Sequence, residues 1–173
     1  MQCTVFPVLA YQPAQEITDT AFLDTPQPYA LQPGDAAWDD LSMEERYQIA
    51  NVPLETSEKL TTHALLLTLL NSPFIANIYA FNSINEGIDR FKEAFPAMDA
   101  LLAREDILTI LDEYVSAFRI ADMDAESEAA VPYYVACRLC QYIVDSITVD
   151  PYVLSIQTLD GLPFISRLLK TAM

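Results

Sequence analysis

Two cysteines, Cys137 and Cys140, form the C-x-x-C motif of this chain. In thioredoxin-like redox proteins the motif follows a strand and opens a helix, within a βαβ pattern that this sequence lacks. A zinc site needs further ligands, and the remaining soft candidates, His63 and Cys3, are far away in sequence. On a helix the pair lies one turn apart, close to the geometry of a disulfide. We favour two buried thiols over a local disulfide, and a disulfide over metal or redox chemistry.

The other candidates for chemistry are one histidine and the acids. His63 is the sole histidine, so a Ser-His or Cys-His mechanism has to use it. We interpret it as a core histidine near a helix N-terminus, where the helix dipole disfavours its charged form. The acidic run 122–128 resembles a calcium loop, but Ser127 replaces the required glycine and Tyr133 the bidentate glutamate. A helix start explains those acids better, and we assign no catalytic, cofactor-binding or metal-ligating residue.

The charge balance narrows the class of partner. Nine lysines and arginines stand against 25 aspartates and glutamates, which gives a net charge of −16. Such a charge repels phosphate backbones and anionic lipids, so we expect neither nucleic-acid nor membrane-surface binding. Three glycines in the whole chain are too few for a glycine-rich phosphate loop. The simplest interpretation is an acidic, solvated surface, and a partner of unknown identity would be a protein.

The most apolar stretch, residues 60–70, predicts the helix around which the rest of the chain packs. Thr61 or Thr62 is a suitable N-cap, because a hydroxyl accepts hydrogen bonds from the free amides of the first turn. Pro73 ends the helix near Asn71. The apolar residues face every direction, and the run is shorter than the roughly 20 residues of a membrane span. We therefore predict a buried central helix over residues 60–71 and no membrane insertion.

Further helices are marked by start signals and periodicity. Ser42 with Glu45, and Ser83 with Glu86, match the capping box, in which serine and glutamate each satisfy a free backbone group. The second box opens a helix with one apolar face, formed by Ile84, Ile88, Phe91 and Phe95.

The clearest amphipathic stripe spans residues 107–118, with Asp106, Asp112 and Glu113 outside it. We expect Pro132 to kink or restart a helix that continues to about residue 147. Residues 151–160 and 163–170 are predicted as helices. The alternative is a β-hairpin of 153–157 and 162–165, although Pro163 disfavours it.

The predicted fold class is all-α: an irregular multi-helix bundle around the central helix 60–71, with an extended N-terminal arm. We divide the chain into this arm, residues 1–37, and one helical domain, residues 38–173. Within the arm, residues 1–10 end with Val8 and Ala10 at the spacing of a signal-peptidase site. They are either the tail of a signal peptide or an apolar segment packed on the domain.

Part of this pattern resembles a group of uncharacterised secreted helical proteins of Gram-positive bacteria. The resemblance covers residues 38–115. It rests on a threonine pair before an apolar helix, a proline after that helix, a Glu-Gly step and a leucine-rich helix that closes on arginine and acids. Thr61-Thr62 departs from the pattern, in which the first residue of this pair is serine. The residues that carry it are 41–46, Thr61, Thr62, 65–70, Pro73, 78–82, Glu86, Gly87, Phe91 and 101–106. The resemblance implies a secreted helical domain and no activity.

From these observations we expect a non-catalytic helical interaction or structural module of an exported bacterial protein, secreted or at the cell surface. A cytoplasmic protein is the alternative location. Two other functions stay open: a hydrolase whose carboxylates are brought together by folding, and a metal or redox protein built on Cys137 and Cys140.

Overall fold

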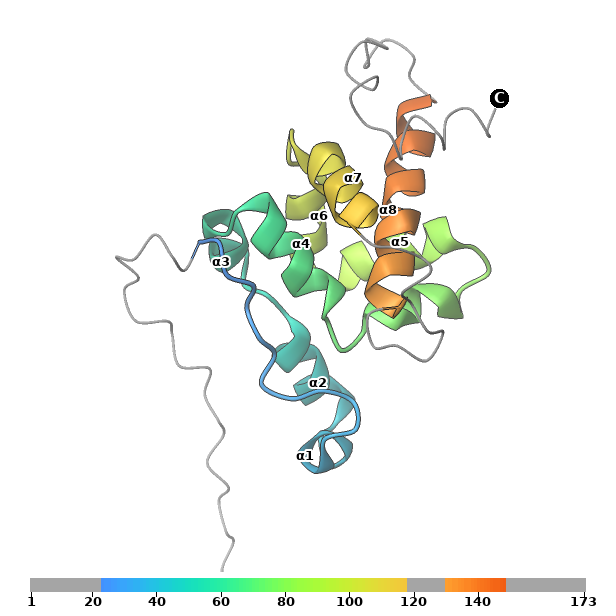
Figure 1. Ribbon diagram of the computed structural model, residues 1–173. Helices are drawn as coiled ribbons and strands as arrows, with labels where there is room; N and C mark the ends of the chain where they lie inside the picture. The colour runs from blue at the N-terminus through green and yellow to red at the C-terminus, as the bar shows by residue number, and fades with distance from the viewer. Residues whose placement is uncertain (1–22, 118–129, 149–173) are drawn as a thin grey trace, which may run out of the picture.

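A computed structural model describes residues 23–117 and 130–148, a part of the chain with eight α-helices, one 3₁₀-helix and no strand (Figure 1). This confirms the all-α prediction for that part. The predictions for residues 1–10, 122–128 and 151–170 lie outside the described residues. In chain order the helices are α1 (Ala36–Asp39), α2 (Met43–Ala50), α3 (Leu54–Lys59), α4 (Thr62–Leu70), η2 (Ile75–Ala80), α5 (Ile84–Ala94), α6 (Ala97–Leu102), α7 (Ile107–Ala117) and α8 (Ala130–Thr148).

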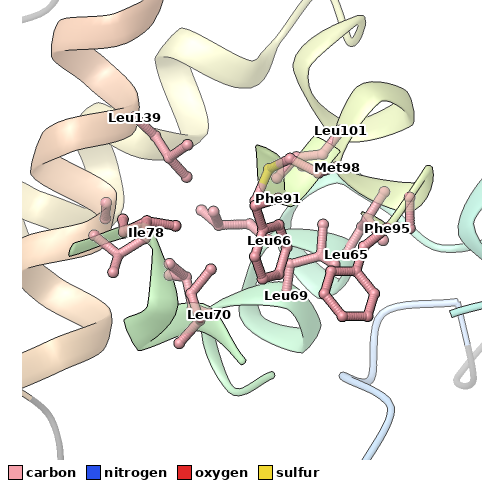
Figure 2. Close-up of a cluster of buried hydrophobic side chains, with 14 of the residues drawn as sticks. Leu65, Leu66, Leu69, Leu70, Ile78, Phe91, Phe95, Met98, Leu101 and Leu139 are labelled. Atoms are coloured by element: carbon pink, nitrogen blue, oxygen red, sulfur yellow. The ribbon is translucent and has the colours of Figure 1, made fainter. Parts of the chain in front are cut away.

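Helix α4 is the predicted central helix. Thr61 caps its start by accepting a hydrogen bond from the Ala64 amide at 3.2 Å, and Asn71 closes its end. Helices α6, α7 and α8 pack against it. Figure 2 shows its leucines among side chains from η2, α5, α6 and α8. The prediction of a buried central helix is confirmed, since four leucines are at most 1% exposed: Leu65, Leu66, Leu69 and Leu70.

The outward strip of α4 contradicts one prediction. His63 is exposed and Leu67 is half-buried, while the other residues of the helix are buried. Residues four apart share one side of a helix, so His63 and Leu67 mark the side of α4 that the other elements leave uncovered. The interpretation of His63 as a core histidine is therefore wrong.

The described part of the predicted N-terminal arm, residues 23–37, has no helix before α1 and is hydrogen-bonded to α4 and its caps. The Thr68 hydroxyl, buried within α4, accepts from the arm and donates back to its own helix. The division at residue 37 stays a prediction. The bonds join Thr61 N to Leu23 O (2.9 Å), Gln27 N to Thr68 Oγ1 (2.9 Å), Thr68 Oγ1 to Ala64 O (2.8 Å) and Gln32 Nε2 to Asn71 O (3.1 Å).

One of the two predicted capping boxes is complete. At the start of α2, the Ser42 hydroxyl accepts from Glu45 N at 3.3 Å, and the Glu45 carboxylate accepts from Ser42 N at 2.8 Å. At the start of α5, Ser83 accepts from Glu86 N at 3.1 Å. The second half is missing there, because the Glu86 carboxylate accepts instead from the Asn82 side-chain amide at 3.4 Å. The box predicted at Ser83 is thus only half formed.

Helices α7 and α8 form a pair. Ile107, Leu111 and Val115 are buried, as the stripe on α7 predicts. Asp112 lies outside that stripe, as the sequence indicates, but it is also buried, with 4% of its surface exposed. Helix α8 packs against α7, and Asp112 is close enough to Cys140 on α8 for its charge to help raise the pKa of that thiol. The Ser116 hydroxyl donates to the buried Asp112 carboxylate at 3.5 Å.

A close approach joins α5 to η2. A Cβ on Gly87 would overlap the Ile78 carbonyl oxygen and lie 2.7 Å from the carbonyl carbon. Real Cβ atoms essentially never come so close to a backbone, so only glycine lets the two helices meet here. This contact sets the distance between η2 and α5, which frame the candidate site.

Candidate functional site

The two cysteines of the C-x-x-C motif are free thiols on α8. Cys140 is buried and Cys137 is half-buried, so the interpretation as buried thiols is confirmed for Cys140 only. Burial raises the pKa of both thiols, and for Cys140 to about 12, with the negative charges of Cys137 and Asp112 adding to the effect. An activated cysteine needs the opposite change, a lowered pKa.

Within residues 23–117 and 130–148, no three His, Cys, Asp or Glu side chains come close enough together to hold a metal ion. His63 lies in the first turn of α4, where its side chain is exposed. Cys3 and the calcium-like run 122–128 are outside the described residues.

A polar cluster links α5, α6 and α8. The Tyr142 hydroxyl donates to Asp89 Oδ1 at 2.6 Å, and Lys92 Nζ donates to the same hydroxyl at 3.3 Å. Lys92 also pairs with Asp99 at 3.2 Å. Burial acts to lower the pKa of Lys92, but its hydrogen bonds to Tyr142 and Asp99 outweigh burial and raise it. Tyr142, Asp89, Lys92 and Asp99 are thus bonded to one another, and their contacts hold α5, α6 and α8 together.

A small cleft lies between α2, η2 and α5, and we call it the aromatic cleft. Its buried lining residues are Phe74, Ile78, Gly87, Phe91 and Phe95, and its exposed lining residues are Tyr47, Asn77, Phe81, Arg90 and Ala94. Figure 2 shows Phe91 and Phe95 beside the leucines of α4, so the floor of the cleft is continuous with the core.

The rings of the aromatic cleft are stacked on one another. The Tyr47 ring lies 4.7 Å from that of Phe74, at an angle of 5°, and 5.6 Å from that of Phe95. Phe91 and Phe95 are 4.6 Å apart. Contacts at these separations add about 0.5–1.5 kcal/mol per pair beyond the burial of apolar area. The stack attaches α2 to the body of the molecule and fixes one wall of the cleft.

The dimensions of the aromatic cleft limit what it can hold. Its volume is about 70 Å³, roughly half of the ~150 Å³ that accommodates a benzene molecule in an engineered cavity. Pockets for drug-sized ligands are larger still, about 300–1,000 Å³. The cleft therefore has room for the end of one side chain.

The rim of the aromatic cleft exposes large apolar side chains. Tyr47 is 41% exposed and Phe81 is 40% exposed. Met43, 53% exposed, lies one turn before Tyr47 on the same side of α2. On neighbouring η2 and α8, Tyr79 and Tyr134 are also exposed. Tyr79 is close enough to α8 for Arg138 to counteract the rise in its pKa that burial causes.

Sequence reasoning did not find this cleft. Tyr47, Phe74, Phe81 and Phe95 belong to separate segments, and each one alone fits a core or core-edge position. One weak signal was available: Met43 and Tyr47 place two large apolar side chains on one side of a short helix whose intervening residues are charged. A binding surface is one explanation of such a pair.

Comparison with protein-family models, with curated proteins and with solved structures gives no match. Among the described residues, no helix combines the length and apolar character needed to cross a membrane.

Proposed function

We propose that this chain is a non-catalytic helical interaction module of an exported bacterial protein, and that a protein partner docks at the aromatic cleft. One observation carries the proposal: the cleft has an aromatic floor and a small volume, exposed Tyr47 and Phe81 line it, and exposed Met43 lies one turn before Tyr47 on α2. Methionine and aromatic residues are enriched in protein interfaces. Grouped exposed apolar side chains mark interaction sites more often than scattered ones do.

The positions of the buried acid and thiol support this choice over the alternatives. Asp112 and Cys140 lie in the interface between α7 and α8. The raised pKa of Cys140 keeps this thiol protonated at neutral pH. Neither group lines the aromatic cleft. A hydrolase or a cysteine-based protein thus has less support than an interaction module.

Export is the second part of the proposal. It is supported by the sequence pattern over residues 38–115, by the small residues Val8 and Ala10, and by the acidic, apolar-rich composition. Fractionation of cells that express the chain from its own gene tests it. We expect the protein in the medium or at the cell surface, and recovery in the cytoplasm alone would contradict export.

Site-specific photo-crosslinking tests the docking role. A photoreactive phenylalanine analogue replaces Phe81 in the full chain, in the source organism, and the control carries it at Glu58 on α3. Figure 1 shows α3 and α5 on different sides of α4, and Glu58 is exposed. We expect a discrete crosslinked protein from position 81 and none from position 58. No crosslink from position 81, in a chain that keeps its thermal midpoint, would contradict the docking role.

A further inference from the structure

We propose that the aromatic cleft binds an aliphatic side chain from a partner segment that carries lysine or arginine. This inference rests on the proposed function and specifies the chemistry of the partner. Two properties of the described residues lead to it: the volume of the cleft and the charge around it.

The volume selects the anchor. At about 70 Å³, the cleft is too small to enclose an aromatic ring, which occupies cavities of ~150 Å³. A leucine, isoleucine, valine or methionine tip is smaller, and the stacked rings of Tyr47, Phe74 and Phe95 offer it an apolar floor. Burying such a side chain against apolar atoms is worth about 1.5–3 kcal/mol. One anchor in a desolvated pocket is the usual form of an interface hot spot.

The charge selects the residues that flank the anchor. The two helices that frame the cleft, α2 and α5, contain five carboxylates and three cationic side chains. All three cations are already engaged. Arg46 donates to the Trp38 and Asp39 carbonyls, Arg90 pairs with Glu93 at 2.8 Å, and Lys92 pairs with Asp99 at 3.2 Å.

One of these carboxylates has no such partner. The Glu44 side chain is exposed and makes no hydrogen bond or ion pair within the described residues. The carboxylates of α2 and α5 therefore outnumber the cationic side chains of these helices, and the potential beside the cleft is negative. Complementary charge on a partner raises the association rate and selects against wrong partners.

Arg90 is the one cation in the lining of the cleft. Its pKa is raised, above all by the hydrogen bond to Glu93 and the charge of that carboxylate, with Glu86 and Asp89 acting in the same direction. An anionic partner would have to displace Glu93 and approach these other carboxylates. This arrangement favours a cationic partner over an anionic one.

A second copy of this chain is the less favourable occupant. Each copy carries a net charge of −16, so two copies repel each other at every orientation that brings the acidic frames together. A lysine- or arginine-bearing partner gains attraction where a second copy meets repulsion.

The test begins with a random peptide library displayed on phage and selected on the full chain. We expect the selected peptides to share one aliphatic residue next to lysine or arginine. Enriched acidic peptides, or peptides whose anchor is aromatic, would overturn the proposal.

The affinity of a synthetic consensus peptide is then measured by calorimetry. We expect Phe81→Ala to weaken binding about tenfold, and Leu54→Ala on α3, with a similarly exposed side chain, to leave it unchanged. Replacing Glu44 by glutamine should slow association and flatten its salt dependence. Unchanged affinity in Phe81→Ala contradicts the proposal. So does a dimer in sedimentation experiments that Phe81→Ala dissociates, because a second copy would then be the occupant.

The two proposals fail in different ways. If position 81 crosslinks to a protein but the selected peptides are acidic, the interaction role stands and the partner chemistry is wrong. If position 81 yields no crosslink, the docking role itself is wrong.

Discussion

Gly87 is the residue at which one methyl group should matter most. Replacing an interior helical glycine by alanine normally stabilises a protein by about 0.5–1 kcal/mol. Here the new Cβ would overlap the Ile78 backbone, which is held within η2. Overpacking costs about 1–3 kcal/mol, so we expect Gly87→Ala to lower the free energy of unfolding in urea. Asn85→Ala, at an exposed position of the same helix, is the control and should cost little. A more stable Gly87→Ala would show that η2 can move.

A second prediction at this scale concerns alkaline pH. Folding raises the pKa of the Cys140 thiol from 9.0 to about 12, chiefly through burial. A group whose pKa is raised by folding stabilises the fold fully below its unfolded pKa. That contribution falls by about 1.4 kcal/mol for each pH unit between the two values. Tyr29, whose pKa burial also raises to about 12, acts in the same sense. We expect the free energy of unfolding to fall as pH rises above 9.

Cys140→Ala isolates the contribution of the thiol. The variant should lose stability at neutral pH because it leaves a small cavity. Its stability should then fall less steeply than that of the parent chain above pH 9, since one titrating group is gone. Equal slopes in urea titrations at several pH values would show that Cys140 ionises with an ordinary pKa.

Single residues were also where sequence interpretation failed. His63 was assigned to the core and is exposed, and the apolar stripe of α7 gave no sign that Asp112 is buried. Both results have one cause. Helical periodicity tells which residues share a side, but it does not tell how many sides the neighbouring elements cover. Helix α4 is left open along one strip, and α7 is covered beyond its apolar stripe.

At the scale of elements, α4 should be the most sensitive to truncation. Leu66 has no exposed surface, so Leu66→Ala should cost about 2–5 kcal/mol through lost burial and the cavity left behind. Leu67→Ala lies on the half-buried outward strip of the same helix. It changes the helix propensity by the same amount as Leu66→Ala, so it should cost clearly less. Urea unfolding measures both variants. Losses below about 1 kcal/mol in Leu66→Ala and in Leu69→Ala would contradict the assignment of α4 as the core.

The elements that were predicted correctly carry strong local signals. Thr61 and Pro73 bracket α4, and the capping box at Ser42 opens α2. Each signal acts through the backbone of one turn, so the local sequence suffices. Helix η2 was less predictable, because its apolar run has no period and its shape depends on the contact between Ile78 and Gly87.

At the scale of the whole molecule, the aromatic cleft could not have been predicted. Its lining comes from α2, η2, α5 and the segment between α4 and η2, and no local pattern records how these elements meet. The charge, by contrast, is evident from the sequence. The polar contacts of the described residues show which cations are already engaged, as at Arg90 and Lys92.

The net charge of −16 leads to the last prediction. Like charges on one compact chain repel each other, and unfolding moves them apart, so the charge destabilises the fold. The three ion pairs of the described residues have exposed members, and such pairs contribute about 0–1 kcal/mol each. Repulsion among the remaining acids should therefore dominate. Raising the ionic strength to about 1 M shortens the screening length to roughly 3 Å, so we expect sodium chloride to raise the midpoint of urea unfolding.

A charge-reduced variant separates this repulsion from general effects of salt on apolar burial. Asp40→Asn, Glu44→Gln, Glu58→Gln and Glu113→Gln change exposed acids and keep the shape of each side chain. In this combined variant the midpoint at low salt should be higher, and its rise with salt smaller, because fewer charges remain to be screened. An equal rise in both proteins would assign the effect to apolar burial, which salts also strengthen. A midpoint that falls with salt would mean that attractive ion pairs outweigh the repulsion between acids. In that case the negative potential proposed around the aromatic cleft would be largely neutralised by cations of the same chain.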